Sequence, residues 1–287
     1  ETDDRSYINT NDIESVSVLT HAASASIYGT RAAFGVLLIK TKSGTKKRPR
    51  RVSYSNNFSW NTPTVLPDFA DPVKELDAMY NASVRSGNTT PDIFGMELPK
   101  LRDGIANWKA KYANNRKGNE MVKGEDFDVI DGVAYFYRVW DVKKLMLKKF
   151  TPQQMQNIQV SGGSEKIGYY LSVGYNHQGG IMKIHPDDVK QYNVTSSVSA
   201  TVNKWLDVDM KMLYRNFDYT EPYQYQTYWY YMWRWGAYWP YGTYDGYYFK
   251  NVPAYLAGAK NTTVKDEFAR INLGATANIA KGLSIRA

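Results

Sequence analysis

The chain has no cysteine, only three histidines and no long apolar run in 287 residues. Without cysteine there are no disulfide scaffolds, thiolate metal sites or cysteine nucleophiles. The lack of any apolar run of about 18 residues excludes a transmembrane helix, but not transmembrane strands, whose side chains alternate. Hydrophobic residues make up 43% of the chain, yet the mean hydropathy is -0.53, so apolar and polar residues are interleaved.

Patterns for catalysis or metal binding are weak. His21, His177 and His185 lie far apart, and the segment 185–188 is explained more simply as a polar loop than as a metal site. The glycine-rich segment 161–164 lies in a predicted hairpin turn with no helix after it, which argues against a phosphate-binding loop. We therefore expect no enzyme activity, no metal and no cofactor.

The net charge of +8 has its clearest concentration at Lys46–Arg51, KKRPRR. Such a segment can bind nucleic acid, but no other basic cluster and no nucleic-acid-binding motif accompanies it. We interpret residues 47–51 as a basic linker and expect no nucleic-acid partner.

Residues 1–46 read as a small α+β unit. Apolar residues predict two short strands over 13–20 and 35–42. Thr20 can cap a helix over 21–28, and Gly29 can end that helix in the left-handed conformation. The expected order is strand, helix, strand.

Apolar and polar residues alternate from residue 52 onward. Val52, Tyr54, Phe58 and Trp60 share one face of the segment 51–60, and the pattern recurs over 169–175, 191–203, 206–215 and 269–280. Alternation gives a strand one apolar and one polar face, and runs of about ten residues suit tilted strands that cross an outer membrane. The pattern predicts roughly seven such antiparallel strands.

The connections between these strands alternate in length. Those at 163–166, 203–205 and 280–282 are short, whereas those at 61–155, 177–190 and 218–267 are long. Transmembrane barrels have short periplasmic turns and long outer loops. This asymmetry predicts that the long connections lie outside the cell and the basic linker at the periplasmic rim.

The first long connection contains one clear helix signal. Asp71 as a cap, Pro72 in the first turn and Gly87 after the end predict a helix with an apolar face. That face would carry Val73, Leu76, Tyr80 and Val84.

The last long connection contains residues 222–249, PYQYQTYWYYMWRWGAYWPYGTYDGYYF, more than half of which are Tyr, Trp or Phe. The segment lacks the apolar periodicity of a core helix or strand, so we expect an exterior aromatic loop. Three roles stay open: contact with a partner protein or loop packing, stacking against a sugar substrate, or an interfacial girdle.

Residues Asn11–Gly44, NDIESVSVLTHAASASIYGTRAAFGVLLIKTKSG, closely resemble the end of the plug domain in SusC/RagA-type TonB-dependent outer-membrane transporters. Met155–Met182 resembles the first barrel hairpin of that family, and the segment 234–248 is a weaker match. Thr20, His21 and Phe34 differ from the residues usual in the family.

The resemblance implies a transmembrane antiparallel β-barrel, of which residues 52–287 would supply the N-terminal strands, preceded by the end of a plug domain in 1–46. It implies TonB-dependent import of an oligosaccharide or peptide across the outer membrane of a Gram-negative bacterium. The implied partners are TonB, through a segment outside this chain, a SusD-like surface lipoprotein as lid, and outer-membrane lipid. It is compatible with a homodimer of transporter–lipoprotein pairs. We expect the chain to be a piece of a larger transporter.

Within the plug, the resemblance points to Tyr28, Gly29, Arg31 and Gly35 as architectural residues. For contact with substrate or lid we select one group in the aromatic segment: Trp229, Trp233, Arg234, Trp235, Tyr238, Trp239 and Tyr241. We prefer a glycan substrate slightly, because of the Trp and Tyr content.

The competing hypothesis is a secreted β-rich carbohydrate-binding protein without transport activity. It would bury its apolar strand faces between two sheets, whereas a transporter exposes them to lipid. A hydrolase would need convergent carboxylates, which the sequence does not place.

Overall fold

The computed structural model describes residues 8–20 and 35–287. The expected helix over 21–28, together with Tyr28, Gly29 and Arg31, lies outside these residues. The described part of the first unit contains a short 3-10 helix, η2 (Thr10–Asp12), and two antiparallel strands, β1 (Ile13–Leu19) and β2 (Val36–Thr41). Both predicted strands are therefore confirmed.

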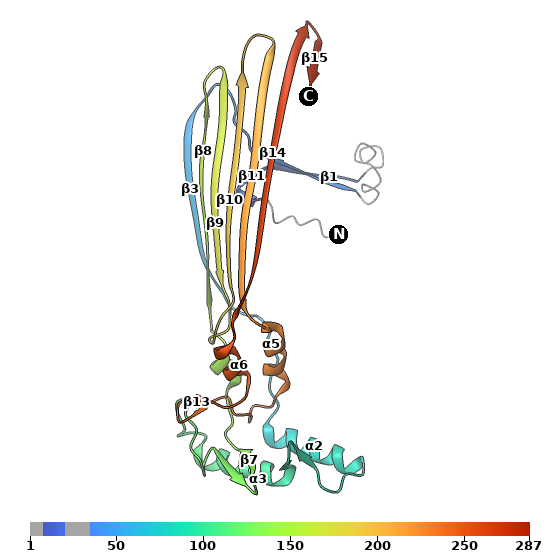
Figure 1. Ribbon diagram of the computed structural model, residues 1–287, viewed down its shortest axis with the longest axis vertical. Coiled ribbons are helices and arrows are strands. Elements are labelled where there is room, and N and C mark those ends of the chain that lie inside the picture. Colours follow the sequence, from blue (N-terminus) through green and yellow to red (C-terminus); the bar gives the residue numbers. More distant parts are fainter. Residues whose placement is uncertain (1–7, 21–34) are drawn as a thin grey trace.

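Seven strands form one open antiparallel sheet, drawn upright in Figure 1. Its order is β15-β14-β11-β10-β9-β8-β3, so strands adjacent in the sheet follow one another along the chain. The strands are β3 (Arg48–Asn61), β8 (Thr151–Gly163), β9 (Ile167–Gly179), β10 (Asp188–Thr201), β11 (Leu206–Pro222), β14 (Asn261–Ala280) and β15 (Leu283–Arg286). The predicted strands are confirmed, although β3 already begins at Arg48, inside the expected linker.

Short and long connections lie at opposite ends of the sheet, as the alternation predicts. The turns at 164–166, 202–205 and 281–282 are short, and the long connections 62–150, 180–187 and 223–260 meet at the other end (Figure 1). The helices of the long connections gather there into one loop assembly.

The faces of the sheet are reversed relative to a water-soluble protein. Outward side chains are apolar and exposed: Val52 by 63%, Leu171 by 42% and Leu273 by 75%. Ser172 and Thr195, on the opposite face, are 1% and 2% exposed. Water-soluble proteins rarely expose contiguous apolar surface of this kind. A different environment must cover the outward face.

The N-terminal unit contacts the polar face of the sheet. The carboxylate of the buried Asp12 accepts hydrogen bonds from the Tyr170 hydroxyl at 2.8 Å and the Thr195 hydroxyl at 2.6 Å. The Lys46 amine lies 2.7 Å from Asp207. Further hydrogen bonds join Asn9 to Asn157, Gln159 to Asn11 and Lys211 to Thr41, so the described residues of this unit contact the sheet through polar groups.

Gly35 opens β2 with a φ of +107°, a conformation that side chains disfavour. A Cβ at this position would also lie 3.0 Å from the Leu19 carbonyl oxygen at the end of β1. Glycine is thus required both for the backbone conformation and for close approach of the two strands.

The loop assembly has ordinary apolar cores. It contains the helices α2 (Pro72–Arg85), α3 (Leu98–Tyr112), α4 (Val142–Met146), α5 (Tyr225–Arg234) and α6 (Val252–Gly258). Small hairpins join them: β4 (Asp92–Ile93) with β5 (Met96–Glu97), β6 (Phe127–Ile130) with β7 (Val133–Phe136), and β12 (Thr243–Tyr244) with β13 (Tyr247–Tyr248). Within the described ranges, no helix is long and apolar enough to cross a membrane.

The helix predicted after Asp71 is confirmed as α2. The Asp71 side chain accepts hydrogen bonds from the backbone N–H groups of Val73 and Lys74, and Pro72 opens the first turn. Leu76 is completely buried against α3. The cap signal therefore identified the start of the helix, and the apolar spacing identified Val73, Leu76 and Tyr80 as packed residues, whereas Val84 is 46% exposed and the prediction for it is wrong.

Candidate functional site

The aromatic segment begins with a helix, so the expectation of a loop without core periodicity is wrong over residues 225–234. In α5, Met232 is completely buried, while Tyr228 and Trp229 pack around the same core. The tyrosines and tryptophans on the other side of the helix hid the periodicity, because these residues count as apolar wherever they point. An aromatic helix without a clear polar face is difficult to recognise from sequence.

The residues selected in the aromatic segment differ in how much of each side chain is exposed. Tyr238 and Tyr241 are each 1% exposed, and Arg234 is exposed. The four tryptophans of the group are half-buried: Trp229, Trp233, Trp235 and Trp239. Only Arg234 and the open edges of the tryptophans are therefore available to another molecule.

Ring contacts hold the four tryptophans in place. Trp233 stacks on Phe69 with ring centroids 5.5 Å apart, and Trp235 contacts Trp239 edge to face at 5.1 Å. Trp235 also stacks on Tyr231 at an interplanar angle of 13°. Such pairs add roughly 0.5–1.5 kcal/mol each beyond area burial, so they stabilise the arrangement of these rings.

The two buried tyrosines belong to the packing beneath this surface. Burial raises the pKa of both the Tyr238 and the Tyr241 hydroxyl, and the nearby Glu75 carboxylate raises it further. The Tyr241 hydroxyl lies 3.4 Å from the Met232 carbonyl oxygen, to which it donates a hydrogen bond. Both hydroxyls remain protonated at neutral pH.

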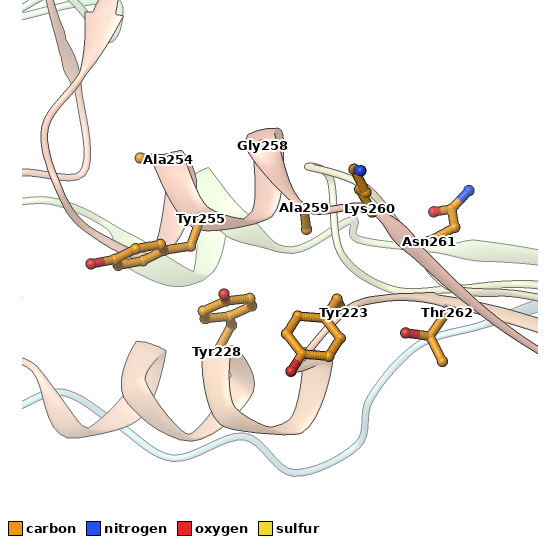
Figure 2. A pocket seen from close by; sticks show the side chains of 9 residues that line it. All are labelled: Tyr223, Tyr228, Ala254, Tyr255, Gly258, Ala259, Lys260, Asn261 and Thr262. Atoms are coloured by element: carbon orange, nitrogen blue, oxygen red, sulfur yellow. The ribbon is translucent and has the colours of Figure 1, made fainter.

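A pocket that the sequence did not predict lies where α5 and α6 meet the sheet. Figure 2 shows the side chains of Tyr228 from α5 and Tyr255 from α6 facing one another, with Tyr223 beside them. The Tyr228 and Tyr255 rings stack at 5.5 Å with only 3° between their planes. The pocket has a volume of about 470 Å³, and its remaining lining residues are Ala254, Gly258, Ala259, Lys260, Asn261 and Thr262.

One signal for this pocket was present in the sequence. Asn251 followed by Pro253 marks a helix start, and the Asn251 side chain accepts a hydrogen bond from the Val252 N–H. Recognising α6 would have placed Tyr255 one turn along it. Its contact with Tyr228, 27 residues earlier, depends on the packing of two helices and is not readable from spacing.

The polar segment 185–188 makes hydrogen bonds within the loops. The His185 ring contacts the Leu256 carbonyl oxygen at 3.0 Å, and the His177 ring lies 2.6 Å from Asp188. Within residues 8–20 and 35–287, no three His, Asp or Glu side chains converge as a metal site would require.

Comparison with known proteins relates this chain to TonB-dependent receptors. No protein-family model matches it. It is 25% identical over 211 residues to TonB-dependent receptor P26 of Formosa agariphila, and 24% identical over 178 residues to TonB-dependent receptor SusC of Bacteroides thetaiotaomicron. These matches cover 74% and 62% of this chain, but only 17% and 13% of the relatives.

The fold is similar to that of the RagAB peptide importer. The open-open state of that importer matches 98% of this chain and 31% of the compared chain, with a TM-score of 0.67 and 21% identity. Together the comparisons confirm the resemblance to SusC/RagA-type TonB-dependent transporters. The relatives are receptors and importers, consistent with the expectation that this chain is not an enzyme.

Proposed function

We propose that this chain is part of a TonB-dependent importer in the outer membrane of a Gram-negative bacterium. In this proposal residues 52–287 contribute strands and outer loops to a transmembrane β-barrel, and residues 1–46 contribute to its plug. The cargo is an oligosaccharide or a peptide, and a SusD-like lipoprotein covers the loop assembly. The chain spans less than a fifth of each curated relative described above.

The main support for the proposal is the sheet, which exposes apolar side chains on its outward face and buries polar side chains on the other face. Lipid is the environment in which an outward row of Val, Leu and Ile is stable, and outer-membrane barrels place polar side chains inside. The exposed Ile271 and Leu273 fit a lipid-facing surface, and the buried Ser172 and Thr195 fit a filled lumen. A secreted carbohydrate-binding protein would cover such apolar rows with a second sheet, and among the described residues no second sheet covers them.

The polar contact between plug and sheet supports gating. Asp12, Lys46 and Lys211 contact the sheet or the plug strands across this interface through hydrogen bonds and ion pairs. Polar contacts can be exchanged for water when the plug moves, whereas separating an apolar core exposes that core. Force transmitted by TonB would release these contacts and open the lumen.

The aromatic surface is the proposed contact for substrate or lid. Arg234 and the open edges of Trp229, Trp233, Trp235 and Trp239 would make the contact, while Tyr238 and Tyr241 hold them from beneath. Aromatic and Arg side chains are common anchors of interfaces. The paired rings of Tyr228 and Tyr255 would add a second stacking surface.

The proposal is tested in cells that carry the full-length protein. We expect it to fractionate with outer membranes, to require detergent for purification, and to copurify with a lipoprotein and bound cargo that mass spectrometry identifies. Trp233→Ala with Trp235→Ala should weaken uptake or lipoprotein binding while the barrel still assembles. A protein that stays monomeric in buffer without detergent would contradict the proposal.

A further inference from the structure

A second cavity, distinct from the tyrosine pocket, lies in the loop assembly between α3, the segment after β7, and α4. Its volume is about 700 Å³, which is in the range of small-molecule sites. Four separate stretches of chain supply its walls, at residues 108–119, 138–141, 144–145 and 183. Its lining is strongly basic.

Two arginines form the fixed part of this cavity. Arg138 is 5% exposed; its guanidinium donates to the carbonyl oxygens of Gly118 and Glu120 and lies 3.8 Å above the Trp140 ring. Arg116 forms ion pairs with Glu125 and with the buried Asp126. Asp126 also lies 3.8 Å from Arg138, so these arginines are held by carboxylates.

Three lysines in the cavity lining carry positive charge that no neighbouring carboxylate of the described residues balances. Lys117, Lys144 and Lys183 line the cavity and are exposed. Among the described residues, none of their amines has a carboxylate within 4.0 Å, although the Lys183 amine donates to the Lys144 carbonyl oxygen. Asp141 is the one acidic lining residue in the described chain, and its carboxylate accepts the Lys144 backbone N–H at the start of α4.

A buried donor in the wall of the cavity is left without an acceptor. Trp140 is 7% exposed, and its Nε1–H makes no hydrogen bond to any described residue. The neighbouring Trp108 Nε1–H, by contrast, donates to Asp126 at 2.8 Å. The Trp140 ring is a fixed part of the cavity wall, because the Arg138 guanidinium lies over its face.

We propose that this cavity binds an anionic group, a carboxylate or sulfate, carried by the imported nutrient. This inference rests on the proposed function, because it takes the loop assembly to face the cargo. The lysine amines attract the anion, and the fixed arginines and the Trp140 ring keep the cavity open. An acidic glycan and an acidic peptide share the required chemistry.

The test measures binding by the full-length protein in detergent, using calorimetry. The acidic probes are trigalacturonate and triglutamate, and the neutral probes are maltotriose and trialanine with both termini blocked. One variant combines Lys117→Gln, Lys144→Gln and Lys183→Gln. The matched control combines Lys111→Gln, Lys123→Gln and Lys250→Gln, three exposed lysines outside the cavity lining, with the same loss of charge.

We expect at least one acidic probe to bind more tightly than its neutral counterpart, with affinity falling as salt is added. The cavity variant should bind it about tenfold more weakly, since partly exposed charge pairs contribute modestly and three of them are lost. The control variant should retain the original affinity. The acidic probe that binds more tightly assigns the cargo as glycan or peptide.

Equal binding of neutral and acidic probes, or equal loss in the two lysine variants, would overturn the anion site. Failure of both acidic probes to bind would overturn it as well. These failures leave outer-membrane location and TonB-dependent uptake unaffected, because both are measured separately on the unmodified protein. A protein absent from the outer membrane would instead contradict the proposed function.

Discussion

The sheet and the loop assembly bury opposite kinds of side chains. In the sheet, Thr195 and Ser197 are 2% and 6% exposed while Leu273 is 75% exposed. In the loop assembly, Leu76, Leu101 and Leu256 are completely buried, as in a water-soluble domain. One chain therefore folds for two environments, and the change occurs where β11 ends at Pro222 and β14 begins at Asn261.

The largest expected effect is in the apolar core of the loops. Leu101→Ala removes a completely buried side chain of α3 and should destabilise the loop assembly by about 2–5 kcal/mol. Limited proteolysis should cleave the loops faster while the sheet keeps its resistance to SDS at low temperature. Val84→Ala is the control, because Val84 is 46% exposed. Equal cleavage rates in the two variants would show that the loops have no such core.

The next effect distinguishes lipid from water at the outward face. Leu273→Arg should cost about 2–4 kcal/mol in a membrane, where a charge on a lipid-facing strand is expensive, and should impair barrel assembly. Tyr247→Arg in β13 is the matched control, because Tyr247 is 80% exposed and belongs to the loops. Electrophoretic mobility before and after heating measures assembly. If the two variants assemble equally well, Leu273 faces water as Tyr247 does, and the outward face does not contact lipid.

The contact between the N-terminal unit, which we propose is part of the plug, and the sheet should show an intermediate effect. Asp12→Ala leaves the hydroxyls of Tyr170 and Thr195 without their acceptor, and each unsatisfied buried group costs about 1–3 kcal/mol. Ion conductance in planar bilayers should rise as the plug loosens. Glu14→Ala removes an exposed ion pair with Lys40, leaves the Asp12 hydrogen bonds in place, and should change conductance much less than Asp12→Ala. Unchanged conductance in both variants would contradict a plug held through Asp12.

The smallest expected effect concerns pH. Burial raises the pKa of the Glu75 carboxyl above its usual value, so the folded loops bind this proton more readily than the unfolded chain. Ionised Glu75 therefore destabilises the loops at neutral pH, and stability is regained as the pH falls through the folded-state pKa. Thermal unfolding should show this dependence in the original protein, and Glu75→Gln should remove it. A variant with the same pH dependence would assign it to another group.

The sequence predicted the sheet far better than the loops. Alternation in segments such as 191–203 fixes strand position and face together, because a shift of one residue would reverse every side chain. In the loops only α2 was predicted, from Asp71 and Pro72. The helices α3, α4, α5 and α6 were missed; in α5 aromatic residues obscure the periodicity, and in α6 the Asn251 and Pro253 signal was overlooked.

The candidate sites, like the loops, were predicted less well than the sheet. The aromatic segment was recognised by composition, but composition did not distinguish the buried Tyr238 from the exposed Arg234. The basic cavity joins Arg116, Arg138, Lys144 and Lys183 from four stretches of chain, and no spacing rule brings such residues together. Packing between separate elements determines which aromatic side chains are buried and which basic side chains come together.

The central claim is that the outward face of the sheet contacts lipid, and three adjacent positions in β9 test it most directly. Leu171 and Val173 point outward with 42% and 45% exposure, whereas Ser172 between them is 1% exposed. Each is replaced by cysteine in a cysteine-free background, spin-labelled, and measured for collisions with oxygen and with a polar nickel complex in bilayers. The account predicts that labels at 171 and 173 collide with oxygen but not with nickel, and that a label at 172 collides little with either. Frequent nickel collisions at 171 and 173 would place that face in water and contradict the account.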